Sequence, residues 1–101
     1  MGKRANQCEF SPAVRAVIYE RDNRRCVLCL GTYGLSVAHM IPRSAGGLGI
    51  PENGALLCQK CHQMMDQGSN TLKKMYLRKA FREYLERHYP GFPDEKRIYH
   101  K

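Results

Sequence analysis

The sequence predicts a small α+β domain that a metal ion holds together. Two C-x2-C pairs stand at residues 26–29 and 58–61, a spacing that is typical of zinc ligands. A short strand is expected over residues 35–41, LSVAHMI, and a second apolar run at residues 55–57 leads into the second pair. Segments with helical spacing flank this unit on both sides. We therefore expect a zinc-stapled core with an N-terminal and a C-terminal helix.

The length and the net charge of the chain limit its domain number and its class of partner. The chain has 101 residues, so we expect residues 1–101 to form a single domain with a modest core. Its net charge is +8, from 17 Lys and Arg against 9 Asp and Glu, and its isoelectric point is near 9.5. This charge favours a polyanionic partner, most simply nucleic acid. A merely solvated basic surface is the alternative, because basic excess is common.

The N-terminal residues, MGKRANQCEF, contain no apolar run that could act as a signal peptide. No stretch approaches the roughly 20 apolar residues of a membrane span. We therefore expect a soluble, cytoplasmic protein that has no membrane partner and keeps its thiols reduced. In that compartment, paired C-x2-C motifs favour zinc over disulfides.

The first quarter of the chain is expected to hold one helix. Residues 1–10 lack periodicity and are interpreted as a flexible basic arm, in which Cys8 has no assigned role. Ser11 and Pro12 form a good helix start, and the helix should end near residues 22–23. Arg24 and Arg25 follow it, either as phosphate contacts or as part of a solvated face.

Two further helices are expected after the second cysteine pair. A short one should run from residue 62 to 67 and stop at Gly68. A longer, basic, amphipathic helix should span about residues 70–88, before a charged and loosely held tail at residues 90–101. Its predicted inner face consists of Leu72, Met75, Tyr76, Ala80, Phe81, Tyr84 and Leu85. Its predicted basic outer face consists of Lys73, Lys74, Arg78, Lys79, Arg82 and Arg87.

The four paired cysteines, Cys26, Cys29, Cys58 and Cys61, can supply the four thiolates of a tetrahedral zinc site. A fully ligated zinc has no open position, so this ion would be structural rather than catalytic. The alternative is that these are four unrelated buried cysteines that bind no metal. A zinc ribbon that binds other proteins is a further alternative for the whole chain.

A second pattern lies between the two pairs. His39 stands near the end of the expected strand, Asn53 in the following loop, and His62 directly after the last cysteine. The segments AHMIPRS, GGLG, PEN and CQKCH resemble the HNH endonuclease family over about residues 11–68. The resemblance implies a ββα-metal (His-Me finger) core of the zinc-knuckle type, with C-x2-C pairs in these same places. Small phage nucleases of the family are most similar in length and layout.

The resemblance also implies roles. His39 matches the general base that takes a proton from the attacking water, and Asn53 matches the residue that orients it. His62 matches a ligand of a catalytic divalent ion such as Mg²⁺ or Mn²⁺. Arg43 is a candidate phosphate clamp. Further candidate DNA contacts are Arg24, Arg25 and Lys60.

One position departs from the family pattern. Ala38 stands where many members have an Asp or His that also binds the metal. Asp66 is the best substitute, because residues four apart share one helix face with His62. The alternative is that Asp66 is an ordinary polar residue that faces Lys60 or Lys73.

We therefore expect a metal-dependent endonuclease that hydrolyses DNA phosphodiesters by nicking, as a monomer or a homodimer. One active site cuts one strand, so a monomer would nick, and a double-strand cut would need a dimer or two sequential events. A non-catalytic DNA-binding zinc module is the alternative, with Ala38 as its main support. The resemblance to phage nucleases further implies phage packaging proteins as partners and the host cytoplasm as location.

Overall fold

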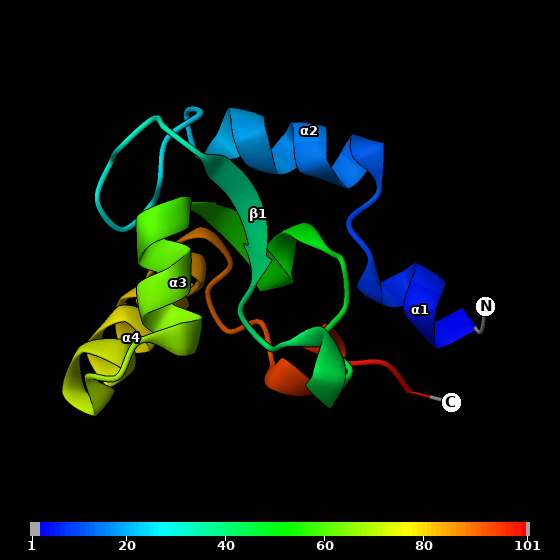
Figure 1. The fold of residues 1–101 in the computed structure, drawn as a ribbon. Helices are drawn as coiled ribbons and strands as arrows, with labels where there is room; N and C mark the ends of the chain where they lie inside the picture. Colours follow the sequence, from blue (N-terminus) through cyan, green and yellow to red (C-terminus); the bar gives the residue numbers. More distant parts are fainter. Residues whose placement is uncertain (1–2, 101) are drawn as a thin grey trace.

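The computed structural model describes residues 3–100 and confirms the predicted α+β class (Figure 1). Two strands form one antiparallel sheet, and four α-helices and three short 3₁₀ helices surround it. In chain order the elements are α1 Lys3–Cys8, α2 Pro12–Arg21, β1 Leu35–His39, η1 Arg43–Ala45, η2 Pro51–Asn53, β2 Gly54–Cys58, α3 Gln59–Gln67, α4 Thr71–His88 and η3 Asp94–Arg97.

The sheet separates two small cores. Side chains alternate between the two faces of a strand, and every residue of β2 is buried. Leu56 packs with Phe10 and Ile18 of the N-terminal segments, on one face. Ala55 and Leu57 lie on the other face and belong to the core that contains Met65, Phe81 and Leu85. In Figure 1, α2 accordingly lies on one side of the strands and α3 and α4 on the other.

Helix starts follow the expected capping chemistry. Ser11 accepts a hydrogen bond from Val14 N at 3.2 Å and caps α2, and Asn70 accepts one from Lys73 N at 3.0 Å and caps α4. The predicted start of the short helix at His62 is wrong. Helix α3 begins at Gln59, because Cys58 occupies the cap position and its sulfur accepts from a backbone amide.

The N-terminal segment is not the flexible arm that the sequence suggested. Residues 3–8 form α1, and residues 1–2 of the predicted arm lie outside the described part of the chain. Cys8 and Phe10 are buried, at 2% and 6% exposure. The segment is fixed because its backbone contacts the glycine loop: Gly49 N donates to Gln7 O at 2.9 Å.

The prediction of a loose C-terminal tail is also wrong for the described residues. Arg97 is 2% exposed and donates to Glu52 O at 2.7 Å and to Phe92 O at 2.8 Å. Ile98 forms a β-bridge with Gly47. A buried guanidinium with several backbone acceptors anchors this charged segment, which composition alone presents as solvated.

Helix α4 buries only its C-terminal half. Phe81 and Leu85 are buried as predicted, but Leu72, Met75 and Tyr76 are 79%, 61% and 64% exposed. The predicted inner face is therefore wrong for the first turns. Among the described residues, no element covers them. No helix of the described chain combines the length and the apolar character needed to cross a membrane.

A buried carboxylate joins α2, β2 and α4. Asp22, 5% exposed, accepts from Arg21 at 2.6 and 3.0 Å, from Leu56 N at 2.9 Å, and from the Tyr84 hydroxyl. Arg21 in turn donates to Gly54 O at 2.7 Å. Burial raises the pKa of Tyr84 to about 12, and the hydrogen bond to Asp22 adds to this. The network links the core around Ile18 and Leu56 to α4 through hydrogen-bonded polar groups.

Replacing Asp22 by alanine should remove this junction and leave the Arg21 guanidinium without its carboxylate. We expect the free energy of unfolding to fall by about 3 kcal/mol, measured by urea denaturation of zinc-loaded protein. Glu20→Ala is the matched control, because its ion pair with Arg24, 3.6 Å long, is largely exposed and contributes little. Equal losses in the two variants would contradict a special role for Asp22.

Candidate active site and zinc cluster

The four paired cysteines come together as predicted. One sulfur from each of Cys26, Cys29, Cys58 and Cys61 lies within 4.8 Å of every other. The Cys29 and Cys58 sulfurs are 3.6 Å apart, and two thiolates on a tetrahedral zinc are separated by about 3.8 Å. The cluster therefore fits a zinc ion, and its four sulfurs leave no place for a substrate or water.

Backbone amides prepare the cluster for thiolates. Gly31 N donates to Cys29 Sγ, and Cys61 N donates to Cys58 Sγ, both at 3.4 Å. Burial raises the pKa of the Cys26 thiol, but backbone hydrogen bonds, the largest from Cys58, outweigh this and bring the pKa to about 7. Burial and the neighbouring sulfurs raise the pKa of Cys61. A dication is what allows four thiolates to share so small a space.

His39 stands at the end of β1, opposite Gly54. Its Nε2 lies 2.6 Å from Cys8 O, and its ring contacts the Phe10 ring with centroids 4.3 Å apart. Burial lowers the pKa of His39; the Cys8 carbonyl opposes this and Arg43 reinforces it. A carbonyl can only accept, so Nε2 carries the hydrogen and Nδ1 keeps its lone pair. The ring is therefore held by a hydrogen bond at Nε2, and Nδ1 can accept a proton.

Residues 7–10 form a strap, here called the N-terminal strap, that contacts the site or the loop beside it. Besides the Cys8 and Phe10 contacts, Gln7 O accepts from Gly49 N, and the Glu9 carboxylate lies 3.0 Å from the Arg43 guanidinium. A side chain on Gly49 would lie 2.1 Å from Glu9 O, so only glycine admits the strap here.

The hydrogen bonds of the Asn53 side chain go to Ile41 and Leu48 rather than to the His39 ring. The Asn53 side chain is fully buried; it accepts from Ile41 N at 2.9 Å and donates to Ile41 O at 3.1 Å and to Leu48 O at 2.9 Å. Its backbone oxygen accepts from Met40 N at 2.9 Å. Asn53 therefore closes the loop that follows β1 and fixes the backbone beside His39.

His62 and Asp66 face each other on α3, as their spacing predicted. His62 Nε2 lies 2.9 Å from Asp66 Oδ2. Two neighbouring ligands of an octahedral Mg²⁺, each about 2.1 Å from the ion, are about 3 Å apart. The pair therefore fits two adjacent positions of such an ion. Ala38 is buried and adds no ligand.

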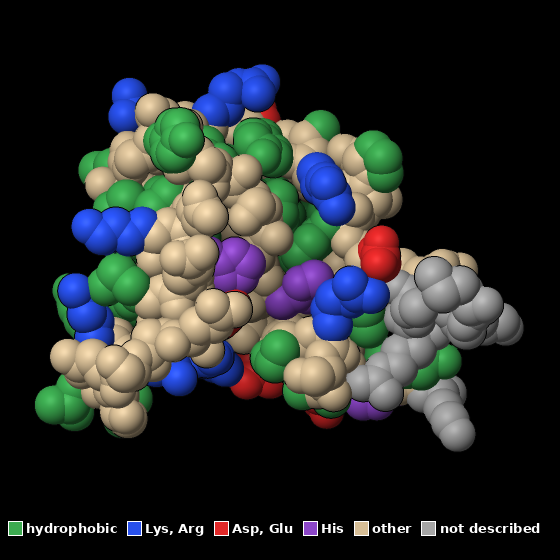
Figure 2. Space-filling model, in the orientation of Figure 1, with side chains coloured by type: hydrophobic (Ala, Val, Ile, Leu, Met, Phe, Trp, Pro, Cys, Tyr) green, Lys and Arg blue, Asp and Glu red, His purple; other side chains and the backbone are tan. Residues whose placement is uncertain are grey.

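His39, His62 and Asp66 line one cavity of about 200 Å³. It lies between the end of β1, the loop after it, α3 and α4. In Figure 2, histidine side chains reach the surface near the middle of the face shown, with Lys or Arg side chains on both sides. The polar lining of the cavity consists of His39, Arg43, His62, Asp66 and Arg78.

The other predicted DNA contacts lie elsewhere. Arg24 pairs with Glu20, Arg25 donates to Leu30 O at 3.2 Å, and Lys60 is exposed at the start of α3. None of these three described residues lines the cavity. They lie next to the paired cysteines in the sequence and outside the cavity.

Two contributors were not predicted. The N-terminal strap gave no signal except an aromatic residue, Phe10, directly before the helix cap. Arg78 was assigned to the outer face of its helix, but it lines the cavity and lies 3.6 Å from Asp66. Helical spacing assigns residues to a face but does not show which neighbouring element that face meets.

Comparison with known proteins identifies the core. Residues 26–67 match the family model described as HNH endonuclease. These residues form an HNH endonuclease domain. Their limits enclose both C-x2-C pairs and the predicted His-Asn-His set.

Among solved structures, the chain is similar to the Type IV phosphorothioation-dependent restriction endonuclease ScoMcrA, with a TM-score of 0.58 and 26% sequence identity. The similarity covers 77% of this chain and 20% of that chain, so the present chain spans about a fifth of that enzyme's length. No curated protein matches. The HNH domain and this neighbour support a nuclease or DNA-binding zinc module.

Zinc should be required for the HNH fold. We expect the wild-type chain to bind one zinc ion and Cys58→Ser to lose both the zinc and cooperative thermal unfolding, because Cys58 is a ligand and also caps α3. Zinc content by atomic emission and circular dichroism melts measure this. Cys8→Ser is the matched control, since Cys8 is equally buried but lies outside the cluster. Full zinc content in Cys58→Ser would contradict the four-sulfur site.

Proposed function

We propose that this HNH domain is a metal-dependent endonuclease that hydrolyses DNA phosphodiester bonds and nicks one strand per active site. The observation that carries the proposal is the shared cavity. His39, the His62–Asp66 pair and Arg43 line one hollow on a basic chain. A base, a metal site and a phosphate contact are the parts that phosphodiester hydrolysis needs.

His39 is the proposed general base. Its Nδ1 takes a proton from the water that attacks phosphorus, as the bond to the leaving oxygen breaks. The Cys8 carbonyl keeps the hydrogen on Nε2 and so holds the reactive tautomer. Asn53 acts as a positioning residue, because its hydrogen bonds fix the backbone after β1.

His62 and Asp66 are the proposed ligands of the catalytic ion, Mg²⁺ or Mn²⁺, with water and phosphate oxygens completing its shell. When bound, such an ion polarises the phosphate and stabilises the leaving oxygen. Asp66 takes the place that Ala38 leaves without a ligand. The structural zinc is separate, because its four sulfurs already fill its coordination.

Arg43 is the proposed phosphate clamp on the β1 side of the cavity. Its guanidinium, about half exposed, pairs with Glu9 at 3.0 Å. A phosphate offers the same two-oxygen geometry as this carboxylate. Arg24, Arg25 and Lys60 are proposed to contact flanking phosphates, so DNA binding should weaken steeply with salt.

A non-catalytic DNA-binding zinc module is the second candidate. Ala38 favours it, since a two-ligand site holds its metal weakly. Phage origin, phage packaging partners, a cytoplasmic location and the choice between monomer and homodimer stay predictions from the family resemblance.

Plasmid nicking tests the nuclease directly. With Mg²⁺ or Mn²⁺, zinc-loaded wild type should convert supercoiled plasmid to the open circle, and EDTA should stop it. His39→Ala should lower the rate by about 10²-fold or more, because the general base is lost, while keeping its affinity for a short duplex.

His88→Ala is the matched control, because His88 contacts Tyr84 on α4 and does not line the cavity. It should nick at the wild-type rate. A wild type that binds DNA but leaves plasmid intact with every divalent ion would favour the binding module.

The pH dependence should report the His39 environment. Only neutral His39 can accept a proton, and its pKa is lowered from the ordinary 6.5, mainly by burial. At saturating metal, kcat/KM should stay level from about pH 8 to about pH 6.5 and fall about tenfold per pH unit only below the His39 pKa. A midpoint of this fall in kcat/KM above pH 6.5 would contradict a buried general base. The same fall at low pH should be absent from His39→Ala.

A further inference from the structure

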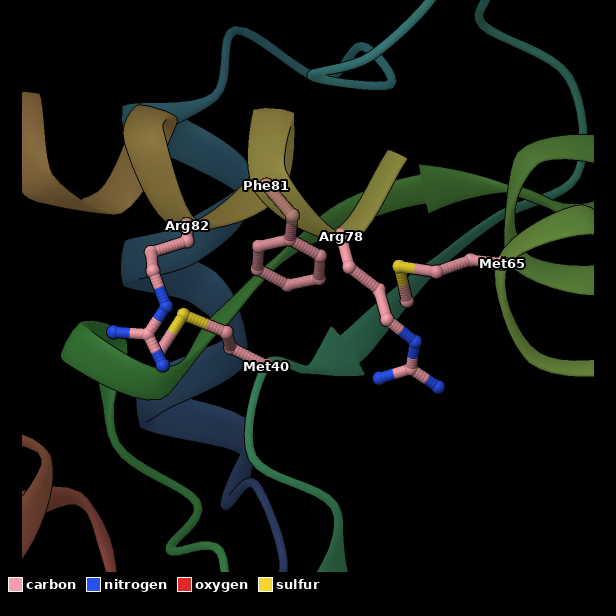
Figure 3. A pocket seen from close by; sticks show the side chains of 5 residues that line it. All are labelled: Met40, Met65, Arg78, Phe81 and Arg82. Carbon is pink, nitrogen blue, oxygen red and sulfur yellow. The ribbon is translucent and has the colours of Figure 1, made fainter. Parts of the chain in front are cut away.

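Arg78 is the polar residue of the cavity that comes from α4. It lines the cavity with His39 and Arg43, and it also lines an adjoining hollow of about 160 Å³. Figure 3 shows Arg78 and Arg82 extending from α4 on either side of the Phe81 ring, with Met40 and Met65 beside them. Arg78 therefore stands at the boundary between the two hollows.

The two arginines differ in how firmly they are paired. Arg82 makes two hydrogen bonds to Asp94, at 3.1 and 2.9 Å, and these hold its guanidinium against the C-terminal segment. Arg78 lies 3.6 Å from Asp66, beyond good hydrogen-bond length, and its side chain is 49% exposed. A loosely paired, half-exposed guanidinium can change partner at low cost.

The partner of Arg78 is itself a proposed metal ligand. Asp66 holds His62 through one oxygen and Arg78 through the other. A divalent ion and the guanidinium therefore compete for one carboxylate, and two cations on it repel each other. A bound phosphate, which is anionic, would give Arg78 a new partner beside Arg43.

We propose that Arg78 is a second phosphate-binding residue of the active site, which exchanges Asp66 for the scissile phosphate when metal and DNA bind. Arg43 of η1 and Arg78 of α4, which line the same cavity as His39, would then both hold the phosphate. This inference rests on the proposed nuclease function and adds a substrate contact from outside residues 26–67. It explains why α4 approaches the cavity with a charged residue at this turn.

The proposal predicts two changes of opposite direction in Arg78→Ala. Without the guanidinium, Asp66 loses a competing cation, so Mn²⁺ should bind about two- to fivefold more tightly. At saturating Mn²⁺, however, kcat for plasmid nicking should fall about 10- to 100-fold, since a charge-stabilising donor is missing. Calorimetric titration of Mn²⁺ into zinc-loaded, DNA-free protein measures the first effect, and nicking rates measure the second.

Lys79→Ala is the matched control. It removes the same charge from the neighbouring position of α4, but Lys79 is exposed and lines neither hollow. It should change Mn²⁺ affinity and kcat less than twofold. Arg78→Lys should keep wild-type Mn²⁺ affinity and recover part of kcat, because it keeps the charge but not the two-pronged donor.

The outcomes separate this inference from the nuclease itself. If wild type nicks and His39→Ala does not, but Arg78→Ala keeps the wild-type kcat, the Arg78 role is wrong and the nuclease stands. Weaker or unchanged Mn²⁺ binding by Arg78→Ala would also overturn it, whether or not wild type nicks. If Arg78→Ala loses its zinc, Arg78→Gln, which keeps the length of the stem, replaces it in both measurements.

Discussion

The four-sulfur cluster is the constraint on which the rest of the HNH domain depends. One pair of its cysteines stands at residues 26–29 and the other at residues 58–61. Cys58 also pairs with Leu35 at the start of the sheet. A strand slip of one residue would turn every side chain to the other face. A zinc ion held by the four sulfurs would fix Cys58 against Cys26 and Cys29, and so would favour the register in which His39 lies opposite Gly54. The same residue starts α3 and so directs His62 and Asp66 toward the cavity.

Both ends of the chain secure the loop between the two strands. The N-terminal strap reaches it at Gly49, and the C-terminal segment reaches it at Gly47 and Leu48. A side chain on Gly47 would come within 1.7 Å of Ile41 O, so the glycines serve close backbone packing. Asn53 completes the closure from inside. His39 therefore lies at the end of a strand whose following loop is held in place by distant segments, and these contacts can keep the proposed site rigid.

Motif chemistry could be predicted from the sequence, and long-range backbone contacts could not. Cysteine spacing, the Ser11 cap and the i, i+4 relation of His62 and Asp66 are local, so their geometry follows from residue type and spacing. The Cys8 carbonyl that holds His39 has no residue-type signal, since every residue offers one. Composition also misjudged the charged tail, because it does not show that Arg97 finds buried acceptors. Periodicity marked Leu72 and Tyr76 as apolar but gave no information on whether a partner element covers them.

The central claim is that the four-cysteine core brings His39 and His62 to one cavity, where His62 is a proposed metal ligand and His39 lies beside it. The most direct test is paramagnetic broadening of the four histidine ring signals when Mn²⁺ is added to zinc-loaded protein. The account predicts that His62 and His39 broaden first, that His88 and His100 stay sharp, and that Asp66→Asn needs more Mn²⁺ for the same effect. Sharp His39 and His62 signals, or equal broadening of all four, would contradict it.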